Sequence, residues 1–232
     1  MSTLSHFPHP REAAEDGLLC VSRTFTTEMI LDAYAHGIFP WPVGEMREML
    51  WWSPWERAVF DLEDFHVPRR LRQTLRSERF RVTTDQAFAR VIRSCASVGG
   101  RKWGTWITRD IIREYTRLHE MGIAHSVEVW EGEVLAGGLY GVAVGGLFAG
   151  ESMFHRRRDA SKVALVHTVE HLRRLGFVLF DVQMTNPHLE QFHVRKVSQE
   201  EYLAKLEKAV SLKRVWRVEC GEWSYDGMGS ES

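Results

Sequence analysis

The chain has 232 residues and a nearly balanced charge, with 30 Lys and Arg against 31 Asp and Glu and a formal net charge of −1. Hydrophobic residues make up 44% and charged residues 26% of the sequence, which excludes collagen-like, fibrous and disordered classes. The longest uncharged run, 136–150, contains six glycines and falls short of the ~20 apolar residues that span a bilayer. The N-terminus also lacks an apolar signal segment, so we expect a protein that is neither secreted nor membrane-spanning.

Hydrophobic periodicity and capping residues predict the elements in chain order. The predicted helices cover 26–36, 68–77, 85–96, 108–121, 159–175 and 199–212, and the predicted strands cover 57–62, 80–83, 124–130, 134–142, 147–153 and 177–184. The segment 37–55 is rich in Pro and Trp, which predicts a packed loop without regular structure.

The three strands within 124–153 are separated by the turns Glu131-Gly132 and Gly145-Gly146, which predicts an antiparallel meander. A long helix follows, and the apolar strand after it suits the interior of a sheet. This order predicts an α+β fold. We place a domain boundary near residue 63, with a small N-terminal domain at 1–62 and a larger domain at 63–232.

Positive charge is concentrated in the middle of the chain. Residues 66–120 carry 13 basic and 5 acidic groups, a net charge of +8, whereas residues 1–65 carry 4 basic and 11 acidic groups. Six of the nine tryptophans lie between Trp41 and Trp106. Arginines suit a polyanion and tryptophans suit stacked bases, although ordinary solvated helix faces give the same charge pattern.

Two groups of polar residues could carry chemistry. Asp181 and Gln183 are two residues apart on the predicted strand 177–184, so a regular strand would place both side chains on one face. A buried polar pair either supports a neighbouring loop through hydrogen bonds or belongs to a site. The second group is Glu151 and Ser152, an acid and a hydroxyl at the end of a strand.

The string HTVEH at 167–171 matches the HxxEH pattern of a class of zinc proteases. The helix pattern buries Leu165 and Val169, which predicts that His167 and His171 face solvent. The three cysteines are far apart and odd in number, so they form neither a disulfide framework nor a CxxC site. We therefore expect no metal site and a reducing cytoplasmic compartment.

Six strings together resemble one family. They are GIFPW at 37–41, WWSP at 51–54, GTWI at 104–107, HSVEVW at 125–130, GESMF at 150–154 and DVQ at 181–183. In this order and spacing the chain resembles the leucyl/phenylalanyl-tRNA–protein transferases. The resemblance implies a C-terminal domain like the GNAT acyltransferases and transfer of Leu or Phe, or in some cases Met, from aminoacyl-tRNA to the N-terminal Arg or Lys of proteins. The acceptors are thereby marked for degradation by the N-degron pathway.

The resemblance also implies roles for single residues. Asp181 and Gln183, with Asn186 as a polar helper, lie at the catalytic centre, and Glu151 binds the acceptor peptide. Trp52 and Trp106 bind the 3′-terminal adenosine. The remaining implied roles concern the aminoacyl side chain, bound by Met153, Phe148, Leu139 and Leu165, and the tRNA backbone, bound by Arg69, Arg70, Arg72 and Arg76. We expect a monomer without a cofactor or metal.

The chain departs from the family pattern near the site. Segment 190–194 lacks a glycine that the family usually has there, and His155 stands where a serine is usual. Three alternatives therefore stay open. They are a related leucyl transferase that acts on acidic N-termini, an acetyl-CoA-dependent GNAT enzyme, and a non-catalytic RNA-binding protein. The GNAT alternative lacks its pyrophosphate-binding turn, because the entry to the long helix reads HRRRDAS at 155–161.

Overall fold

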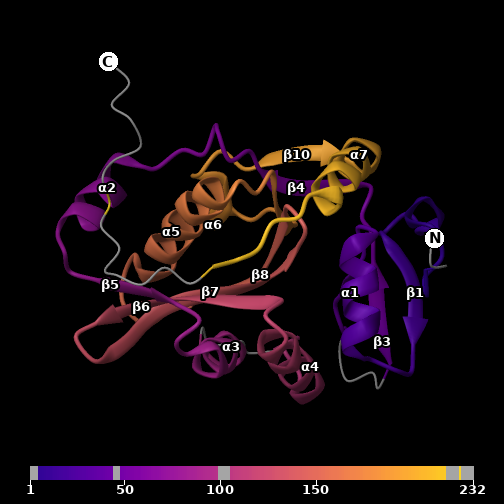
Figure 1. Cartoon of the computed structure of the whole chain (residues 1–232), viewed down its shortest axis with the longest axis horizontal. Helices are drawn as coiled ribbons and strands as arrows, with labels where there is room; N and C mark the ends of the chain where they lie inside the picture. Colours follow the sequence, from indigo (N-terminus) through magenta and orange to yellow (C-terminus); the bar gives the residue numbers. More distant parts are fainter. Residues whose placement is uncertain (1–4, 44–47, 99–104, 218–224, 226–232) are drawn as a thin grey trace.

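The computed structural model describes residues 5–43, 48–98, 105–217 and 225 (Figure 1). Its helices are the 3₁₀ turn η1 (Pro10–Glu12), α1 (Thr27–Ala35), α2 (Arg69–Arg76), α3 (Phe88–Ser97), α4 (Arg109–Glu120), α5 (Ala160–Leu175), α6 (Pro187–Glu190) and α7 (Gln199–Ser211). Its strands are β1 (Leu18–Ser22), β2 (Phe39–Pro40), β3 (Met49–Trp52), β4 (Glu56–Phe60), β5 (Arg81–Thr84), β6 (Ala124–Glu131), β7 (Val134–Val144), β8 (Leu147–His155), β9 (Leu179–Gln183) and β10 (Arg195–Ser198).

The strands form two sheets. A three-stranded sheet has the order β1-β3-β2, and a seven-stranded sheet has the order β10-β4-β9-β8-β7-β6-β5. Strands β6, β7 and β8 pair antiparallel, while β8 and β9 pair parallel. The α+β class and the meander are therefore confirmed, and β9 lies in the sheet interior as predicted. The likeness of the larger domain to GNAT enzymes stays a prediction.

Helices cover both faces of the large sheet, with α5 on one face and α3 and α4 on the other (Figure 1). Strand β7 shows why, because its side chains alternate between the two faces. Leu139 packs into the core beneath α5, whereas Tyr140 and Val142 belong to the core formed with α3 and α4. A third core lies under α7, where Leu206 packs against strands β4, β8, β9 and β10.

The loop predicted over 37–55 is wrong in part. Strand β3 pairs antiparallel with both β1 and β2, and Trp51 at its centre is fully buried. The sequence pattern of 37–55 did not predict β2 and β3. One partner of β3, strand β1, lies outside this segment, and the other, β2, is only two residues long. Strand β10 and helix α6 were not predicted either.

Strand β4 bears on the expected domain boundary. It precedes residue 62, yet it lies between β10 and β9 in the seven-stranded sheet. We therefore propose that the N-terminal unit ends just before β4, near residue 55, rather than at residue 62.

The prediction that His167 and His171 face solvent is wrong. Both side chains are buried, and Trp216 from the tail after α7 packs edge-on against His171 with ring centroids 4.5 Å apart. A second face of α5 is thus covered by the segment that contains Trp216. The hydrophobic periodicity of α5 itself does not predict this contact. Burial, followed by the effect of His171 and Arg174, lowers the pKa of His167 to about 3.

The described residues hold neither a membrane-spanning helix nor a metal-binding cluster. None of the helices in the described ranges combines the length and apolarity needed to cross a membrane. Within the same ranges, no group of three or more His, Cys, Asp or Glu side chains is arranged to hold a metal ion.

Candidate functional site

The candidate site lies where two neighbouring parallel strands separate. Pairing between β8 and β9 runs from Leu147–Leu179 to Ala149–Asp181 and then stops, although β8 continues to His155. The fork holds a cavity of about 410 Å³. Its apolar lining comes from Leu139, Met153, Leu165, Phe180, Val182 and Leu189, and its polar lining includes Glu151, Ser152, Gln183, Thr185 and Asn186.

Asp181 and Gln183 do not share one face, which corrects the prediction from regular alternation. The register between β4 and β9 shifts opposite Val182, and Gln183 adopts a left-handed backbone with φ of 61°. Such a bulge redirects the side chains of a strand. Gln183 lines the cavity, whereas Asp181 is completely buried behind it.

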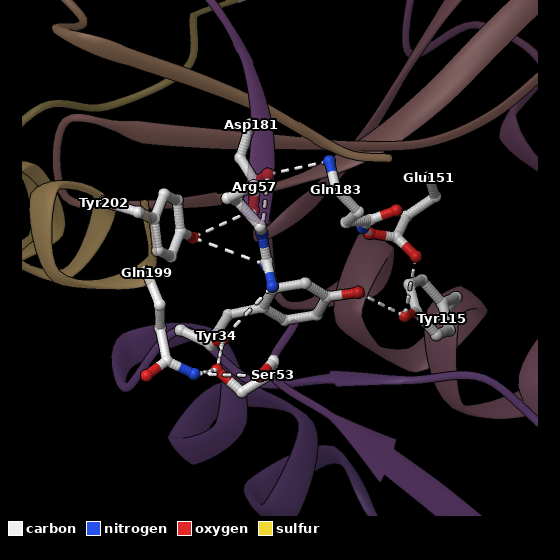
Figure 2. Close-up of polar contacts among 10 residues, drawn as sticks. Tyr34, Ser53, Arg57, Tyr115, Glu151, Asp181, Gln183, Gln199 and Tyr202 are labelled. Atoms are coloured by element: carbon white, nitrogen blue, oxygen red, sulfur yellow. Dashed lines mark hydrogen bonds and ion pairs between the residues drawn. The ribbon is translucent and has the colours of Figure 1, made fainter. Parts of the chain in front are cut away.

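Asp181 is surrounded by hydrogen-bond donors (Figure 2). Arg57 donates from Nε at 3.0 Å and from Nη2 at 2.7 Å, and the Tyr202 hydroxyl donates at 2.8 Å. The backbone N–H of Gln183 donates to Oδ1 at 2.8 Å. Arg57 is itself only 1% exposed. Burial alone would lower the pKa of Arg57, but the Asp181 carboxylate outweighs it and raises that pKa.

Glu151 is the carboxylate that faces the cavity. Gln183 Nε2 donates to its Oε1 at 2.8 Å, and the Tyr115 hydroxyl donates to Oε2 at 3.1 Å. The hydroxyls of Tyr115 and Tyr34 lie 2.6 Å apart, which extends the chain of polar groups toward α1 (Figure 2). Burial raises the pKa of Glu151 to about 7, and the nearby Asp181 adds to the rise although hydrogen bonds oppose it.

The tryptophan pair at the cavity differs from the predicted one. Trp106 lines the cavity as expected, but its partner is Trp41, whose ring stacks on it with centroids 5.3 Å apart and planes 20° apart. Trp52 does not line the cavity. Its indole N–H donates to the backbone carbonyl of Trp41 at 2.9 Å, so it contacts the cavity wall from behind.

The structure brings three of the four predicted side-chain-pocket residues together. Met153, Leu139 and Leu165 line the cavity, whereas Phe148 is fully buried in the core, where it stacks on Trp216 and meets Phe180 edge-on. Phe148 lies where β8 and β9 are still paired, and its side chain belongs to the core beneath α5.

Asn186 and the predicted tRNA-binding arginines lie in different places. Asn186 lines the cavity while its Oδ1 accepts from the N–H groups of His188 and Leu189 and caps α6. The four arginines lie outside the cavity on α2, with exposed side chains. They are Arg69, Arg70, Arg72 and Arg76.

The sequence analysis missed Arg57, Tyr202, Tyr34 and Tyr115. One signal was present, because Arg57 stands directly before Ala58, Val59 and Phe60, in a strand whose other charged residue is the exposed Glu56 at its first position. A charge in such a strand needs a buried partner. The tyrosines gave no such signal, since a tyrosine on a helix is an ordinary core residue.

Comparisons with known proteins agree with one another. The family model described as leucyl/phenylalanyl-tRNA protein transferase matches residues 59–207, and the model of its N-terminal domain matches residues 23–54. A leucyl/phenylalanyl-tRNA–protein transferase of Anaeromyxobacter sp. (strain K) is 48% identical over 228 residues, covering 97% of this chain and 95% of the relative. The transferase of Oleidesulfovibrio alaskensis is 44% identical, covering 96% of this chain and 90% of the relative.

Among solved structures, a C-terminal domain of the DUF2156 kind from Agrobacterium fabrum gives a TM-score of 0.39 at 15% identity, over 84% of this chain and 66% of that chain. A similarity that low carries no argument. The two family models together cover most of the chain, and the relatives match it nearly end to end. The chain belongs to the leucyl/phenylalanyl-tRNA–protein transferase family.

Proposed function

We propose that this transferase joins leucine or phenylalanine from its tRNA to an N-terminal Arg or Lys of an acceptor protein. The observation that carries the proposal is the cavity itself, which combines an apolar wall with the carboxylate of Glu151, the one acidic side chain among the described residues that line it. An apolar pocket suits a leucyl or phenylalanyl side chain. A carboxylate suits the ammonium or guanidinium of a basic acceptor.

The reaction requires few catalytic groups from the protein. The amine nitrogen attacks the ester carbonyl carbon, the bond from that carbon to the ribose oxygen breaks, and the amine loses a proton while the ribose oxygen gains one. An α-amino group with a pKa of about 7.7–8.0 is partly neutral near pH 7. Holding the two substrates in line therefore supplies much of the rate.

The contacts favour an indirect role for Asp181. Its oxygens accept from Arg57, Tyr202 and the Gln183 backbone, and it does not line the cavity. We infer that Asp181 fixes Gln183, whose side-chain amide then orients the amine. Glu151 holds the acceptor and is the carboxylate placed to take the proton that the amine releases.

The donor would bind at the opposite side of the cavity. The stacked pair Trp41 and Trp106 offers an aromatic face for the terminal adenosine, a kind of contact that tolerates any base. Trp52 supports this platform through its hydrogen bond to Trp41. The exposed arginines of α2 remain our candidates for the acceptor-stem backbone, because phosphate contacts need charge without base readout.

The alternatives are disfavoured by particular contacts. An acidic acceptor side chain would meet the carboxylate of Glu151 in a partly buried site, which is a repulsive arrangement. An RNA-binding protein without activity would leave the contacts among Glu151, Gln183 and Asp181 unused. The proposal further includes action as a monomer in the cytoplasm, where charged tRNA is made, and without a cofactor.

One experiment tests the donor and the acceptor together. Separately charged leucyl-, phenylalanyl- and methionyl-tRNA are supplied with peptides that begin with Arg, Lys, Asp, Glu or Ala, and the product masses are read. We expect a gain of one leucine or phenylalanine on the Arg and Lys peptides alone. Transfer to Asp or Glu peptides, or modification that requires acetyl-CoA, would contradict the proposal.

A further inference from the structure

We propose that Arg57 is a positioning residue that holds the two halves of the site in register, the tryptophan platform on one side and Gln183 on the other. The inference rests on the proposed function for the roles of those two halves. Arg57 lies on β4, beside β9, and its side chain contacts both Phe39 of β2 and Asp181 of β9. Its Nη1 donates to the carbonyl of Gly37 at 3.2 Å, and its Nη2 donates to Asp181 at 2.7 Å.

The contact with Gly37 leads directly to the platform. Gly37 is followed by Ile38, strand β2 and then Trp41. The position of the Gly37 carbonyl therefore helps to set where β2 begins and where the Trp41 ring lies. Gly37 has a positive φ of 80°, and a Cβ at this position would lie 2.8 Å from Leu203 on α7. The turn therefore accepts no other residue without strain, and its carbonyl has a defined direction.

The contact with Asp181 leads to the other half. Asp181 accepts from the backbone N–H of Gln183, and the Gln183 amide in turn donates to Glu151. The left-handed backbone of Gln183 is costly for a residue other than glycine. The hydrogen bond from its N–H to the fixed Asp181 carboxylate is the contact that favours this conformation.

The guanidinium has no freedom to move between these contacts. It lies between the rings of Phe39 and Tyr202, with its central carbon 4.6 Å and 4.5 Å from the two centroids. Ser53 donates to the same Gly37 carbonyl at 3.2 Å. Gln199 from α7 holds Ser53 through donation to its backbone carbonyl at 2.9 Å. Figure 2 shows this chain of contacts from α7 to Glu151.

Stability alone is a weak reason for such a pair. Removing two charges from water costs about as much as their attraction returns, and well-packed apolar residues often replace a buried ion pair without loss. A guanidinium, however, presents several donors in a fixed fork, so it can bind a carboxylate on one edge and a carbonyl on another. This geometry, rather than its charge, makes Arg57 suited to align two segments.

The decisive variant is Arg57→Lys, because it keeps the charge but offers one point of donation in place of a fork. We expect the single-turnover transfer rate at saturating donor to fall by about 100-fold, the scale of a misplacement of about 1 Å at a reacting centre. We also expect weaker binding of phenylalanyl-tRNA, since the platform loses its support. The matched control is Arg195→Lys on β10, where the exposed arginine pairs with Asp61 and touches neither half.

Two further variants disturb one half each. Tyr202→Phe removes one donor from Asp181 and should lower the transfer rate by about tenfold with donor affinity unchanged. Ser53→Ala removes the second donor to the Gly37 carbonyl and leaves Arg57 Nη1 as the remaining one, so it should weaken donor binding while the rate at saturating donor stays near that of the unchanged protein. Both variants keep Arg57, so they test the inference even if Arg57→Lys fails to fold.

The result that overturns the inference is a set of variants with lowered melting temperatures but unchanged rate and donor affinity well below those temperatures. That result would make Arg57 a purely structural residue. The inference would also be contradicted if Tyr202→Phe and Ser53→Ala each lowered the transfer rate and the donor affinity by the same factor. That result would mean that the two halves of the site cannot be disturbed independently. Failure of the unchanged protein to transfer to any Arg or Lys peptide would instead refute the proposed acceptor, while donor binding by the same variants still tests Arg57.

Discussion

Trp41 and Trp106 are 65 positions apart in the chain and stack with their ring centroids 5.3 Å apart. Both line the cavity, and Trp41 is further held by the indole N–H of Trp52. A stacked pair at a cavity edge presents a broad aromatic face, which is why we assign the adenosine platform to Trp41 and Trp106 in place of Trp52 and Trp106.

Replacing Trp41 by alanine should weaken the binding of phenylalanyl-tRNA by about 1–3 kcal/mol, the range for one base–aromatic stack. The reason is loss of the face on which the adenine ring would lie. Binding to aminoacyl-adenosine, measured by calorimetry, should weaken equally because this fragment carries the stacked base.

Trp55→Ala is the matched control for this change. Trp55 is 48% exposed and donates to the carbonyl of Ala14 away from the cavity, so donor binding should not change. If Trp41→Ala binds aminoacyl-adenosine as tightly as the unchanged protein, the platform assignment is wrong.

Glu151→Gln should remove a pH-dependent step in transfer. With its pKa near 7, Glu151 is protonated at low pH and cannot hold a cationic acceptor, so the rate should rise as the pH passes through about 7. The glutamine variant should be slow at every pH and keep only the rise due to the acceptor amine near pH 7.7–8.0. Single-turnover rates from pH 5.5 to 9 measure both profiles, and identical profiles would exclude Glu151 from the reaction.

The same residue makes a prediction about stability. The folded protein keeps a proton on Glu151 up to a pKa of about 7, while the unfolded chain releases it near 4.5. Stability from this group is therefore present below about pH 4.5 and is lost as the pH rises to about 7. Urea unfolding should show this loss in the unchanged protein, and the loss should be absent in Glu151→Gln, because glutamine does not titrate.

His167 should act in the opposite direction. Its pKa of about 3 in the folded protein means that the unfolded chain takes up a proton first as the pH falls below about 6.5. Stability should therefore decrease between about pH 6.5 and pH 3. In His167→Leu this decrease should be smaller, while the exposed His155→Leu control should retain it. Equal slopes in both variants would show that His167 does not stay neutral.

Asp181→Asn should lower both stability and rate. Removing the carboxylate leaves the Arg57 guanidinium buried without its counter-charge, which typically costs 3–5 kcal/mol of unfolding free energy. Transfer should slow by about 100-fold through displacement of Gln183, and Gln183→Ala should be non-additive with it. Asp61→Asn, which removes an exposed partner of Arg195, is the control. A folded Asp181→Asn protein with an unchanged rate would show that Asp181 has no part in transfer.

The arginines of α2 can be tested through salt. If Arg69 and Arg72 contact phosphates, the slope of log affinity for tRNA against log salt should fall in magnitude by about one for each arginine replaced. The control is Lys205 on α7, which pairs with Glu201. Lys205→Ala should leave the slope unchanged. An unaltered slope in the arginine variants would place the tRNA on another surface.

Local patterns in the sequence determined much of the fold. Thr26 and Thr108 cap α1 and α4 through their side chains as the sequence predicts, because capping depends on residues within one turn. Gly176 ends α5 with a left-handed backbone. The meander followed from two tight turns between β-prone segments. Short-range geometry fixes all of these features, so a single sequence suffices to predict them.

The sequence also predicted several residues of the site, but it did not predict how their side chains are arranged. Glu151, Gln183, Met153 and Trp106 all line the cavity. The pattern did not reveal the bulge at Val182, because it depends on how β4 meets β9. As a result Gln183 lines the cavity and Asp181 does not, and the expectation of one shared polar face was wrong.

Only the tertiary structure decided which distant residues meet. Arg57 and Asp181 are 124 residues apart, and their pairing depends on the placement of β4 beside β9 in the large sheet. Trp41 replaces Trp52 at the cavity because β3 and β2 pair in one particular register. His171 of α5 is covered because the tail brings Trp216 against it. Each of these outcomes follows from long-range packing. The periodicity of a sequence predicts which face of an element is buried, but it does not predict which other element covers that face.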